Sequence, residues 1–120
     1  MKDLTEELPG LERIKLRFLD LLEERSSIIA NCTLAAWDTP DAAVASSELS
    51  QAQSILHQIA GSAGSLGFAA LGQNARKCEE AIVRHLAEAG QSDANVPVAI
   101  IDDLGQFVLM SQDLMSQGGP

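Results

Sequence analysis

The sequence has few aromatic residues, no tyrosine and no long apolar run. Aromatic side chains make up 3% of its 120 residues. Alanine and leucine dominate its apolar fraction, which favours helices over sheets. No stretch approaches the ~20 apolar residues that a membrane span requires. The first ten residues, MKDLTEELPG, carry three acids and no apolar stretch, so they do not resemble a signal peptide. We therefore expect a soluble, cytoplasmic protein.

Basic residues and cysteines are also scarce. Eight Lys and Arg residues stand against 17 Asp and Glu residues, which gives a formal net charge of −9. Such a surface repels nucleic-acid backbones and anionic lipid, so neither a nucleic acid nor a membrane is an expected partner. Cys32 and Cys78 lie far apart on apolar stripes and are predicted to be buried free thiols. No Cys/His cluster has zinc spacing, and no metal or other cofactor is expected.

Apolar residues recur at steps of three and four along most of the chain, which predicts amphipathic helices. Pro9 and Gly10 are expected to separate a short N-terminal helix or turn, within residues 1–10, from a longer helix over residues 11–37. Thr39 is the predicted N-cap of the second helix, with Pro40 in the first helical position. Gly67 is predicted to end that helix near residue 66.

A third helix is predicted over residues 68–89, with Gly90 ending it, and Pro97 is predicted to open a fourth. Residues 117–120 are expected to form a frayed tail. Four amphipathic helices with short connections indicate an all-α, antiparallel up-down four-helix bundle. We expect one domain over residues 1–120, and a monomer, because a chain with four helices completes its own bundle.

The stretch ILHQIAGSAGSLGF, residues 55–68, places a histidine among unusually small neighbours. The apolar stripe of this helix centres near Leu56 and Ala63, which turns His57 roughly 100° away from the core. All the residues predicted to share its face are small or neutral and polar: Ser50, Gln53, Ser54, Ala60, Gly61 and Gly64. Exposed helical faces are normally filled by Glu, Lys and Arg, which are solvated and good helix formers.

Two interpretations of this face remain open from the pattern alone. In the structural one, Gly61 and Gly64 allow a neighbouring helix to pack closely, and His57 is a boundary histidine with a satisfied hydrogen bond. In the chemical one, His57 is an exposed nucleophile, because much of an imidazole is unprotonated at neutral pH. The small neighbours then leave room for another protein to approach the ring and exchange a phosphoryl group with it.

These residues resemble the histidine-containing phosphotransfer (HPt) domains of multistep phosphorelays. The family signature is a histidine, two variable residues, usually a lysine, then Gly-Ser and a further apolar-Gly pair. In HQIAGSAGSLG these positions fall on His57, Ala60, Gly61, Ser62, Leu66 and Gly67. The segments RFLDLLEERSSIIANC and LGQNARKCEEAI resemble the helices before and after the motif. The resemblance therefore covers most of the chain.

The resemblance implies that His57 accepts a phosphoryl group from the receiver-domain aspartate of a hybrid kinase. It would then pass the group to the receiver aspartate of a response regulator. Such a protein is a carrier, not an autonomous enzyme, and the receiver brings the Mg²⁺. The same resemblance implies a supporting and receiver-docking role for the residues around the histidine: Gln53, Ser54, Gln58, Ala60, Gly61, Ser62 and Gly64.

Ala60 departs from the family pattern, because the usual residue there is a lysine that attracts the phosphoryl oxygens. Arg76, Lys77 and Arg84 of the third helix are candidate substitutes; helix phase groups Lys77 with Arg84 and separates Arg76 from them. The other histidine, His85, lacks small neighbours and is interpreted as structural.

The departure at Ala60 supports one alternative, a degenerate relative that binds a receiver without phosphotransfer. A second alternative, the phosphoacceptor part of a histidine kinase, would need a nucleotide-binding domain, of which the sequence shows no motif. A carboxylate-bridged metal bundle is excluded, because neither histidine has a glutamate three residues before it.

Overall fold

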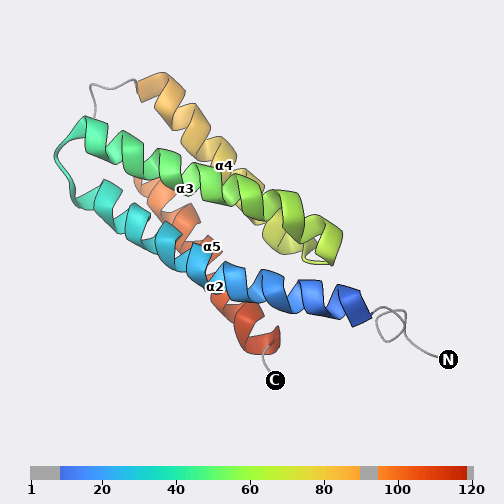
Figure 1. The fold of residues 1–120 in the computed structure, drawn as a ribbon. Coiled ribbons are helices and arrows are strands. Elements are labelled where there is room, and N and C mark those ends of the chain that lie inside the picture. Colours follow the sequence, from blue (N-terminus) through green and yellow to red (C-terminus); the bar gives the residue numbers. More distant parts are fainter. Residues whose placement is uncertain (1–8, 90–94, 119–120) are drawn as a thin grey trace.

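A computed structural model of the chain describes residues 9–89 and 95–118 and shows long helices running in alternating directions (Figure 1). Within the described residues there is no strand, and the elements are α2 (Pro9–Asp38), α3 (Ala42–Ala63), the 3-10 helix η1 (Gly64–Leu66), α4 (Ala69–Ala89) and α5 (Val98–Gly118). Both α2 and α4 pack against α3 and α5, which closes a ring of helices. The prediction of an all-α, up-down four-helix bundle is confirmed.

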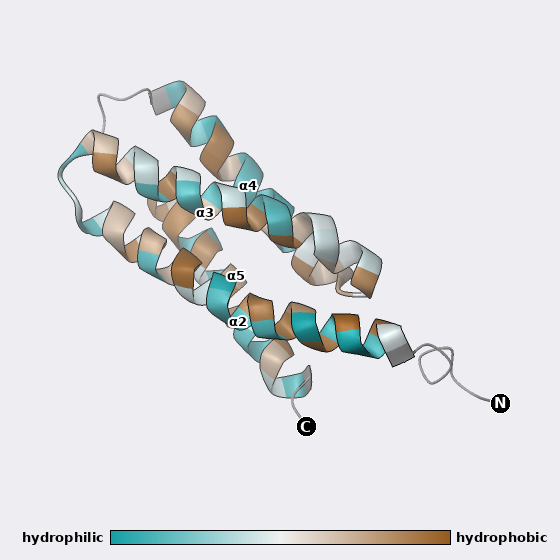
Figure 2. Cartoon of the chain, in the orientation of Figure 1, coloured by the Kyte–Doolittle hydropathy of each residue, from teal (hydrophilic) through white to brown (hydrophobic). Residues whose placement is uncertain are grey.

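The core lies along the axis of this ring and is built from one stripe of each helix. Figure 2 shows the corresponding alternation of hydrophobic and hydrophilic bands along the ribbons. The largest fully buried apolar side chains come from all four helices: Leu22, Ile29, Leu49, Leu56, Ile59, Leu71, Ile82, Leu104 and Phe107. Burying such side chains supplies the main driving force for the fold.

The first long helix begins earlier than expected. Pro9 and Gly10 form the first residues of α2 instead of a break before it. Proline suits the first helical position, because its missing N–H would have no partner there in any case. The predicted short N-terminal helix falls in residues 1–8, which lie outside the described part of the chain.

The predicted start of α3 was wrong by two residues. Asp41, not Thr39, is the N-cap: its Oδ1 accepts hydrogen bonds from the backbone N–H groups of Ala43 and Val44 at 2.9 and 3.4 Å. Pro40 therefore precedes the helix. The hydroxyl of Thr39 instead accepts a hydrogen bond from the N–H of Asp41 at 3.1 Å. A carboxylate at this position also complements the positive end of the helix dipole.

Gly67 ends the α3–η1 segment, as predicted. Its φ of 91° lies in the left-handed region that favours glycine. The next residue, Phe68, donates its backbone N–H to the carbonyl oxygen of Ala63 at 2.8 Å and so closes the turn. Its ring stacks on Phe18 of α2 with the centroids 5.2 Å apart. This contact ties the turn between α3 and α4 to the first helix of the bundle.

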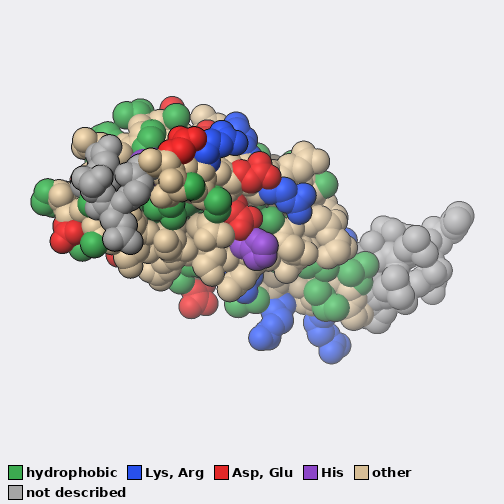
Figure 3. All heavy atoms as spheres, turned by 90° about the horizontal axis from the view of Figure 1, so that it is seen from above, with side chains coloured by type: hydrophobic (Ala, Val, Ile, Leu, Met, Phe, Trp, Pro, Cys, Tyr) green, Lys and Arg blue, Asp and Glu red, His purple; other side chains and the backbone are tan. Residues whose placement is uncertain are grey.

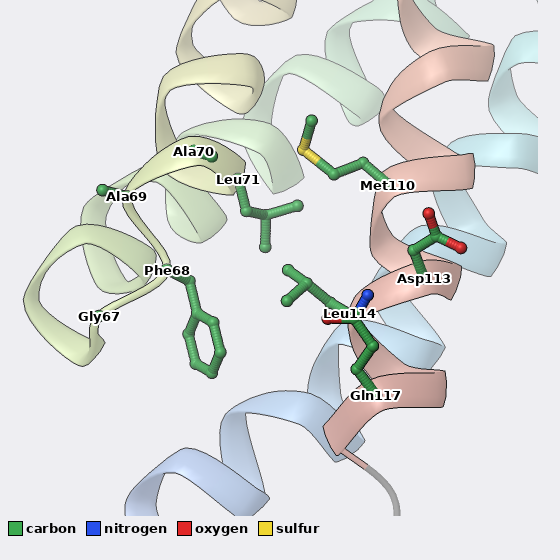
Figure 4. A pocket seen from close by; sticks show the side chains of 9 residues that line it. All are labelled: Gly67, Phe68, Ala69, Ala70, Leu71, Met110, Asp113, Leu114 and Gln117. Carbon is green, nitrogen blue, oxygen red and sulfur yellow. The ribbon is translucent and has the colours of Figure 1, made fainter.

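A hollow of about 320 Å³ opens at the same end of the bundle, between the start of α4 and the end of α5 (Figure 4). Phe68 and Leu71 line one wall, and Met110 and Leu114 line the other. Leu71 is also part of the buried core, and Phe68 makes the stacking contact with α2. The hollow is therefore the open end of the core.

The fourth helix begins where predicted and extends further than predicted. The carbonyl oxygen of Pro97 accepts hydrogen bonds from the N–H groups of Ile100 and Ile101 at 3.0 and 3.3 Å. Helix α5 then continues to Gly118, so residues 117 and 118 are helical and not part of a frayed tail. Gly90 and residues 119–120 lie outside the described part.

Both cysteines are buried free thiols, which confirms that prediction. Burial raises the pKa of Cys32 to about 11, with smaller contributions from a hydrogen bond and the charge of Glu48. Burial likewise raises the pKa of Cys78 to about 11, and the nearby charge of Asp103 adds to the effect. Both groups are therefore neutral near pH 7.

Candidate functional site

The outward side of α3 carries an exposed histidine among small residues. The side chain of His57 is 74% exposed. Ser54, Gly61 and Gly64 are also exposed, and we refer to these four residues as the His57 face. Helix α3 contains no Lys or Arg, and its one charged residue is Glu48. The face therefore has neither bulky nor charged side chains of its own.

The glycines of the His57 face have no packing role within the described structure. A Cβ atom built on Gly61 or on Gly64 meets nothing within 4 Å. The glycine that does serve helix packing is Gly72 of α4, where a Cβ would lie 3.4 Å from the Cβ of Ala63. The structural interpretation of Gly61 and Gly64 as a close helix contact is therefore wrong, and the space beside them is open.

His57 is oriented by a carboxylate from the neighbouring helix. Its Nδ1 lies 2.8 Å from Oε2 of Glu79, which projects from α4. The same oxygen accepts a hydrogen bond from the side-chain Nε2 of Gln53 at 2.8 Å. The Glu79 side chain is only 15% exposed, so the α3–α4 contact fixes it in place. Together the three side chains form a chain of hydrogen bonds along this contact.

This geometry determines which ring nitrogen is available. A carboxylate oxygen accepts hydrogen bonds, so the pairing with Glu79 places a proton on Nδ1 of His57. In the neutral ring Nε2 then carries the free lone pair. Since the ring is mostly exposed and bonded on its Nδ1 side, the nucleophilic nitrogen is presented to the solvent.

Glu79 is the one residue of this hydrogen-bonded group that the sequence analysis missed. It follows Cys78 directly and so stands at the edge of the apolar stripe of α4. An acidic residue at that edge is a weak signal, because helix edges often carry charges that are simply solvated. Only the antiparallel pairing of α3 with α4 brings it opposite His57.

Ala60 does not belong to the exposed surface, contrary to prediction. It is buried and forms part of the core cluster. Ala60 and Gly61, three and four residues after His57, lie on opposite sides of His57 on the helix surface. Helix α4 covers the side that carries Ala60. Gly72 packs there, and its Cβ would lie 3.7 Å from the carbonyl oxygen of Ala60. Ala60 is thus a packing residue of the α3–α4 contact.

The three candidate cations on α4 point in different directions. Lys77 lies 4.0 Å from Asp103 of α5, on the side away from α3. Arg84 lies two turns beyond Lys77 on that same side of the helix. Arg76 is one turn before Glu79, and both it and Glu79 occupy the side of α4 next to α3. Figure 3 shows a histidine beside acidic and basic side chains on the upper face of the molecule.

Arg76 is exposed, and within the described residues it makes no ion pair. It stands between Gly72, which packs against Ala60 and Ala63, and Glu79, which contacts His57. Its flexible side chain therefore starts from the edge of the His57 face. Of the three candidates, Arg76 is the one that helix phase places on the side of α4 next to α3.

The remaining predicted site residues surround His57 less closely. Gln58 is exposed, and its carbonyl oxygen accepts a hydrogen bond from Oγ of Ser62 at 3.3 Å. Within the described ranges no group of three or more His, Cys, Asp and Glu side chains could hold a metal ion. None of the described helices is long and apolar enough to cross a membrane.

Comparison with known families agrees with this arrangement. The model of the family described as Hpt domain matches residues 17–112. The chain belongs to the Hpt domain family. Hpt domains are helical phosphocarrier modules that take part in histidine phosphotransfer and interact with receiver domains. Comparison with curated proteins and with solved structures gave no match. The match spans α3 and α4, and so includes His57 and Glu79.

Proposed function

We propose that His57 is the phosphoacceptor of this Hpt domain and that Nε2 is the reacting atom. The observation that carries the proposal is the orientation of the ring. Its Nδ1 is 2.8 Å from the Glu79 carboxylate, while the side chain is 74% exposed. A nucleophile for a protein-bound phosphoryl group needs an accessible lone pair and no bulky neighbours. The His57 face meets both requirements.

The transfer step follows from this geometry. Nε2 attacks the phosphorus of an aspartyl phosphate on a receiver domain, a P–N bond forms, and the P–O bond to the aspartate breaks. The aspartate leaves as a carboxylate. Positive charge develops on the imidazole ring. The Glu79 carboxylate, which accepts a hydrogen bond from the Nδ1–H group, stabilises this charge. Transfer to a second receiver aspartate runs through the same steps in reverse.

Arg76 takes the part of the lysine that is missing at position 60. The transferred group carries negative charge and would lie outward from Nε2, on the side of the ring away from Nδ1. Helix phase places Arg76 on the side of α4 next to α3, whereas Lys77 lies 4.0 Å from Asp103 on α5. A long guanidinium side chain can bind phosphoryl oxygens through two parallel hydrogen bonds.

The partners proposed for this chain are two receiver domains, one on a hybrid histidine kinase and one on a response regulator. Both would approach the His57 face, where the missing side chains of Gly61 and Gly64 leave space. The receiver would supply Mg²⁺ together with its aspartate. We propose that the carrier acts as a monomer in the cytoplasm.

The direct test is phosphorylation of the purified chain with a radiolabelled, phosphorylated receiver domain and Mg²⁺. We expect label on the wild type in an acid-labile, base-stable linkage, as phosphohistidine requires. His57→Gln should remain folded and unlabelled, since its side chain is mostly exposed. His85→Gln is the matched control and should be labelled like the wild type.

A small phosphodonor tests whether His57 can accept a phosphoryl group, independently of which receiver domain is the partner. Potassium phosphoramidate should phosphorylate the wild type and His85→Gln but not His57→Gln, as seen in the intact mass. If no donor labels the wild type, yet a receiver binds it, the chain is a binding module without phosphotransfer. The departure from the family lysine at Ala60 is the observation that favours this second function.

A further inference from the structure

An apolar surface runs along the contact between α2 and α5. Leu34 of α2 and Leu109 of α5 are more than half exposed there, and so are Trp37, one turn after Leu34, and Val98, one turn before Ile101. A hollow of about 320 Å³ lies between the two helices, and the residues that line it include Thr33, Leu34, Ile101, Gly105, Val108 and Leu109. The twelve residues from Val98 to Leu109 span ~16 Å, or about three helical turns.

Gly105 lies in this hollow without a packing reason. A Cβ atom built on it meets nothing within 4 Å, so no part of the described structure needs the missing side chain. Glycine inside a helix is less favourable than alanine, because it loses more backbone freedom on folding. Its effect here is to deepen the hollow and expose the backbone of α5. The surface thus shares a feature with the His57 face, a glycine that leaves room for something outside the molecule.

The charged residues beside the hollow are acidic. On α5, Asp102 lies one turn after Val98 and two turns before Leu109. On α2, Asp38 lies one turn after Leu34, and the preceding residues 26–37 carry no charge. Helix α5 has no Lys or Arg. Lys77 of α4 faces Asp103 on the other side of α5. The surface is therefore an apolar groove with an acidic rim.

We propose that this α2–α5 groove is a docking site for an amphipathic helix of a partner protein. The helix would place an apolar stripe in the hollow and flanking Lys and Arg side chains beside Asp38 and Asp102. Apolar contact would supply the affinity, and charge complementarity would set the orientation of the bound helix. A second copy of this chain fits poorly, because it would bring two acidic rims together; an anionic membrane is repelled for the same reason.

The groove is separate from the phosphoacceptor site. His57 and Glu79 belong to the α3–α4 contact, and the α2–α5 contact lies across the ring of helices from it. A helix bound in the groove leaves the His57 face free for a receiver domain. The inference does not rest on phosphotransfer, since the groove, the glycine and the acidic rim are independent of His57.

A synthetic helical peptide provides the probe for this surface. It carries leucines at steps of three and four and lysines on both flanks, and it contains no tryptophan. Trp37 is the one tryptophan of the chain, and it is 51% exposed beside the groove. Titration should give a saturable blue shift of its emission that weakens with added salt. Amide shifts in NMR spectra should change at residues 30–37 and 98–112 and not at residues 53–64.

Exposed positions provide variants that keep the fold. Leu34→Asp and Leu109→Asp should each lower the peptide affinity at least tenfold, with unchanged thermal unfolding and unchanged labelling of His57. Val83→Asp alters an exposed apolar residue of α4 and is the matched control, which should bind like the wild type. A peptide with glutamates in place of its lysines should not bind.

Several results would overturn the proposal. These are the absence of saturable binding, equal binding of the acidic peptide, equal loss in Val83→Asp, and amide shifts confined to α3 and α4. Sedimentation of the free chain could also overturn the proposal. A dimer that the Leu109→Asp substitution dissociates would show that a second copy of the chain occupies the groove.

Discussion

Two regions of the α3–α4 pair contain glycine for opposite reasons. At Gly72 the two helices approach so closely that a Cβ would meet Ala63 at 3.4 Å and the backbone nitrogen of Gly64 at 3.5 Å. On the His57 face, by contrast, a Cβ on Gly61 or Gly64 would meet nothing. The first glycine lies inside a packed helix contact, where little room remains beyond a Cβ, whereas the other two leave open space beside the histidine. Residue type alone does not separate these roles, and the surrounding space does.

The glycines of the two regions also differ in their effect on the stability of the fold. The inward glycine lies in a packed helix contact, where a Cβ would be at van der Waals distance from α3 and a larger side chain would have to displace its neighbours. The outward glycines weaken α3 by up to about 1 kcal/mol each relative to alanine, and nothing in residues 9–89 and 95–118 packs into the space they leave. Stability lost without an internal gain is expected where another protein must approach. The predictions below separate the two roles by changing one region at a time.

The largest expected effect comes from filling the open space beside His57. Gly61→Leu should slow phosphoryl transfer from a receiver by about 100-fold, because small displacements of reacting groups have effects of that size. The thermal stability should not fall, since a Cβ at this position meets nothing within 4 Å in the described part of the chain. Rapid-quench measurement of transfer tests this.

Gln51→Leu is the matched control for this variant, because it adds the same side chain at an exposed position of α3 well away from His57. If both variants transfer at the wild-type rate, the space beside Gly61 has no role in docking. If both are equally slow, the effect is not specific to the His57 face.

Filling the inward region should instead affect stability. Gly72→Leu should destabilise the fold by about 1–3 kcal/mol, as overpacking a close helix contact does. Urea unfolding followed by circular dichroism measures the change. Gly64→Leu is the matched variant on the outward side and should change the unfolding free energy by less than about 0.5 kcal/mol. Equal losses in the two variants would contradict the distinction between the regions.

The charge of Glu79 should have a smaller effect, on transfer alone. Glu79→Gln keeps an acceptor for Nδ1 of His57 but removes the carboxylate charge. Hydrogen bonds to charged groups exceed neutral ones by about 1 kcal/mol, so transfer should slow roughly five- to tenfold. The nitrogen that is phosphorylated, identified by NMR of the phosphohistidine, should still be Nε2. Phosphorylation at Nδ1 would show that Glu79 does not set the tautomer.

The smallest expected effect is that of Arg76. Arg76→Ala should shift the transfer equilibrium away from phosphorylated His57 by about two- to fivefold, in the range of an exposed charge pair. The effect should fade at high salt, because exposed charges are screened. Lys77→Ala removes an equivalent charge on the α5 side of α4 and should leave the equilibrium unchanged. If Lys77→Ala has the larger effect, Arg76 is not the substitute for the family lysine.

The helices and the core were predictable from periodicity, because each helix buries one apolar stripe. The errors lie where neighbouring signals compete. Thr39 and Asp41 are both good N-caps, and the one that caps depends on the path of the chain through Pro40. The end of the last helix was also predicted wrongly. A tail of low helix propensity was expected to fray from residue 117, yet α5 continues to Gly118.

The site was only partly predictable, and helix phase explains why. Phase gives the angle between a residue and the core, but not which flank a neighbouring helix covers. His57 and Gly61 were correctly placed outward, whereas Ala60 was placed outward and is buried. Helix phase could not predict the contact of Glu79 with His57, because it joins residues 22 positions apart on different helices. The same pairing of helices that hides Ala60 brings Glu79 to the ring.

The buried thiols have a consequence for how the domain behaves under oxidising conditions. Peroxides and disulfides react with the thiolate form of cysteine, and in this protein the pKa of both cysteines is raised to about 11. At neutral pH almost no thiolate is present, and neither sulfur is open to solvent. The domain should therefore keep its activity during oxidative stress that inactivates proteins with exposed, acidic thiols. A cysteine introduced at an exposed site would accept a fluorescent label selectively, with the native pair left unmodified.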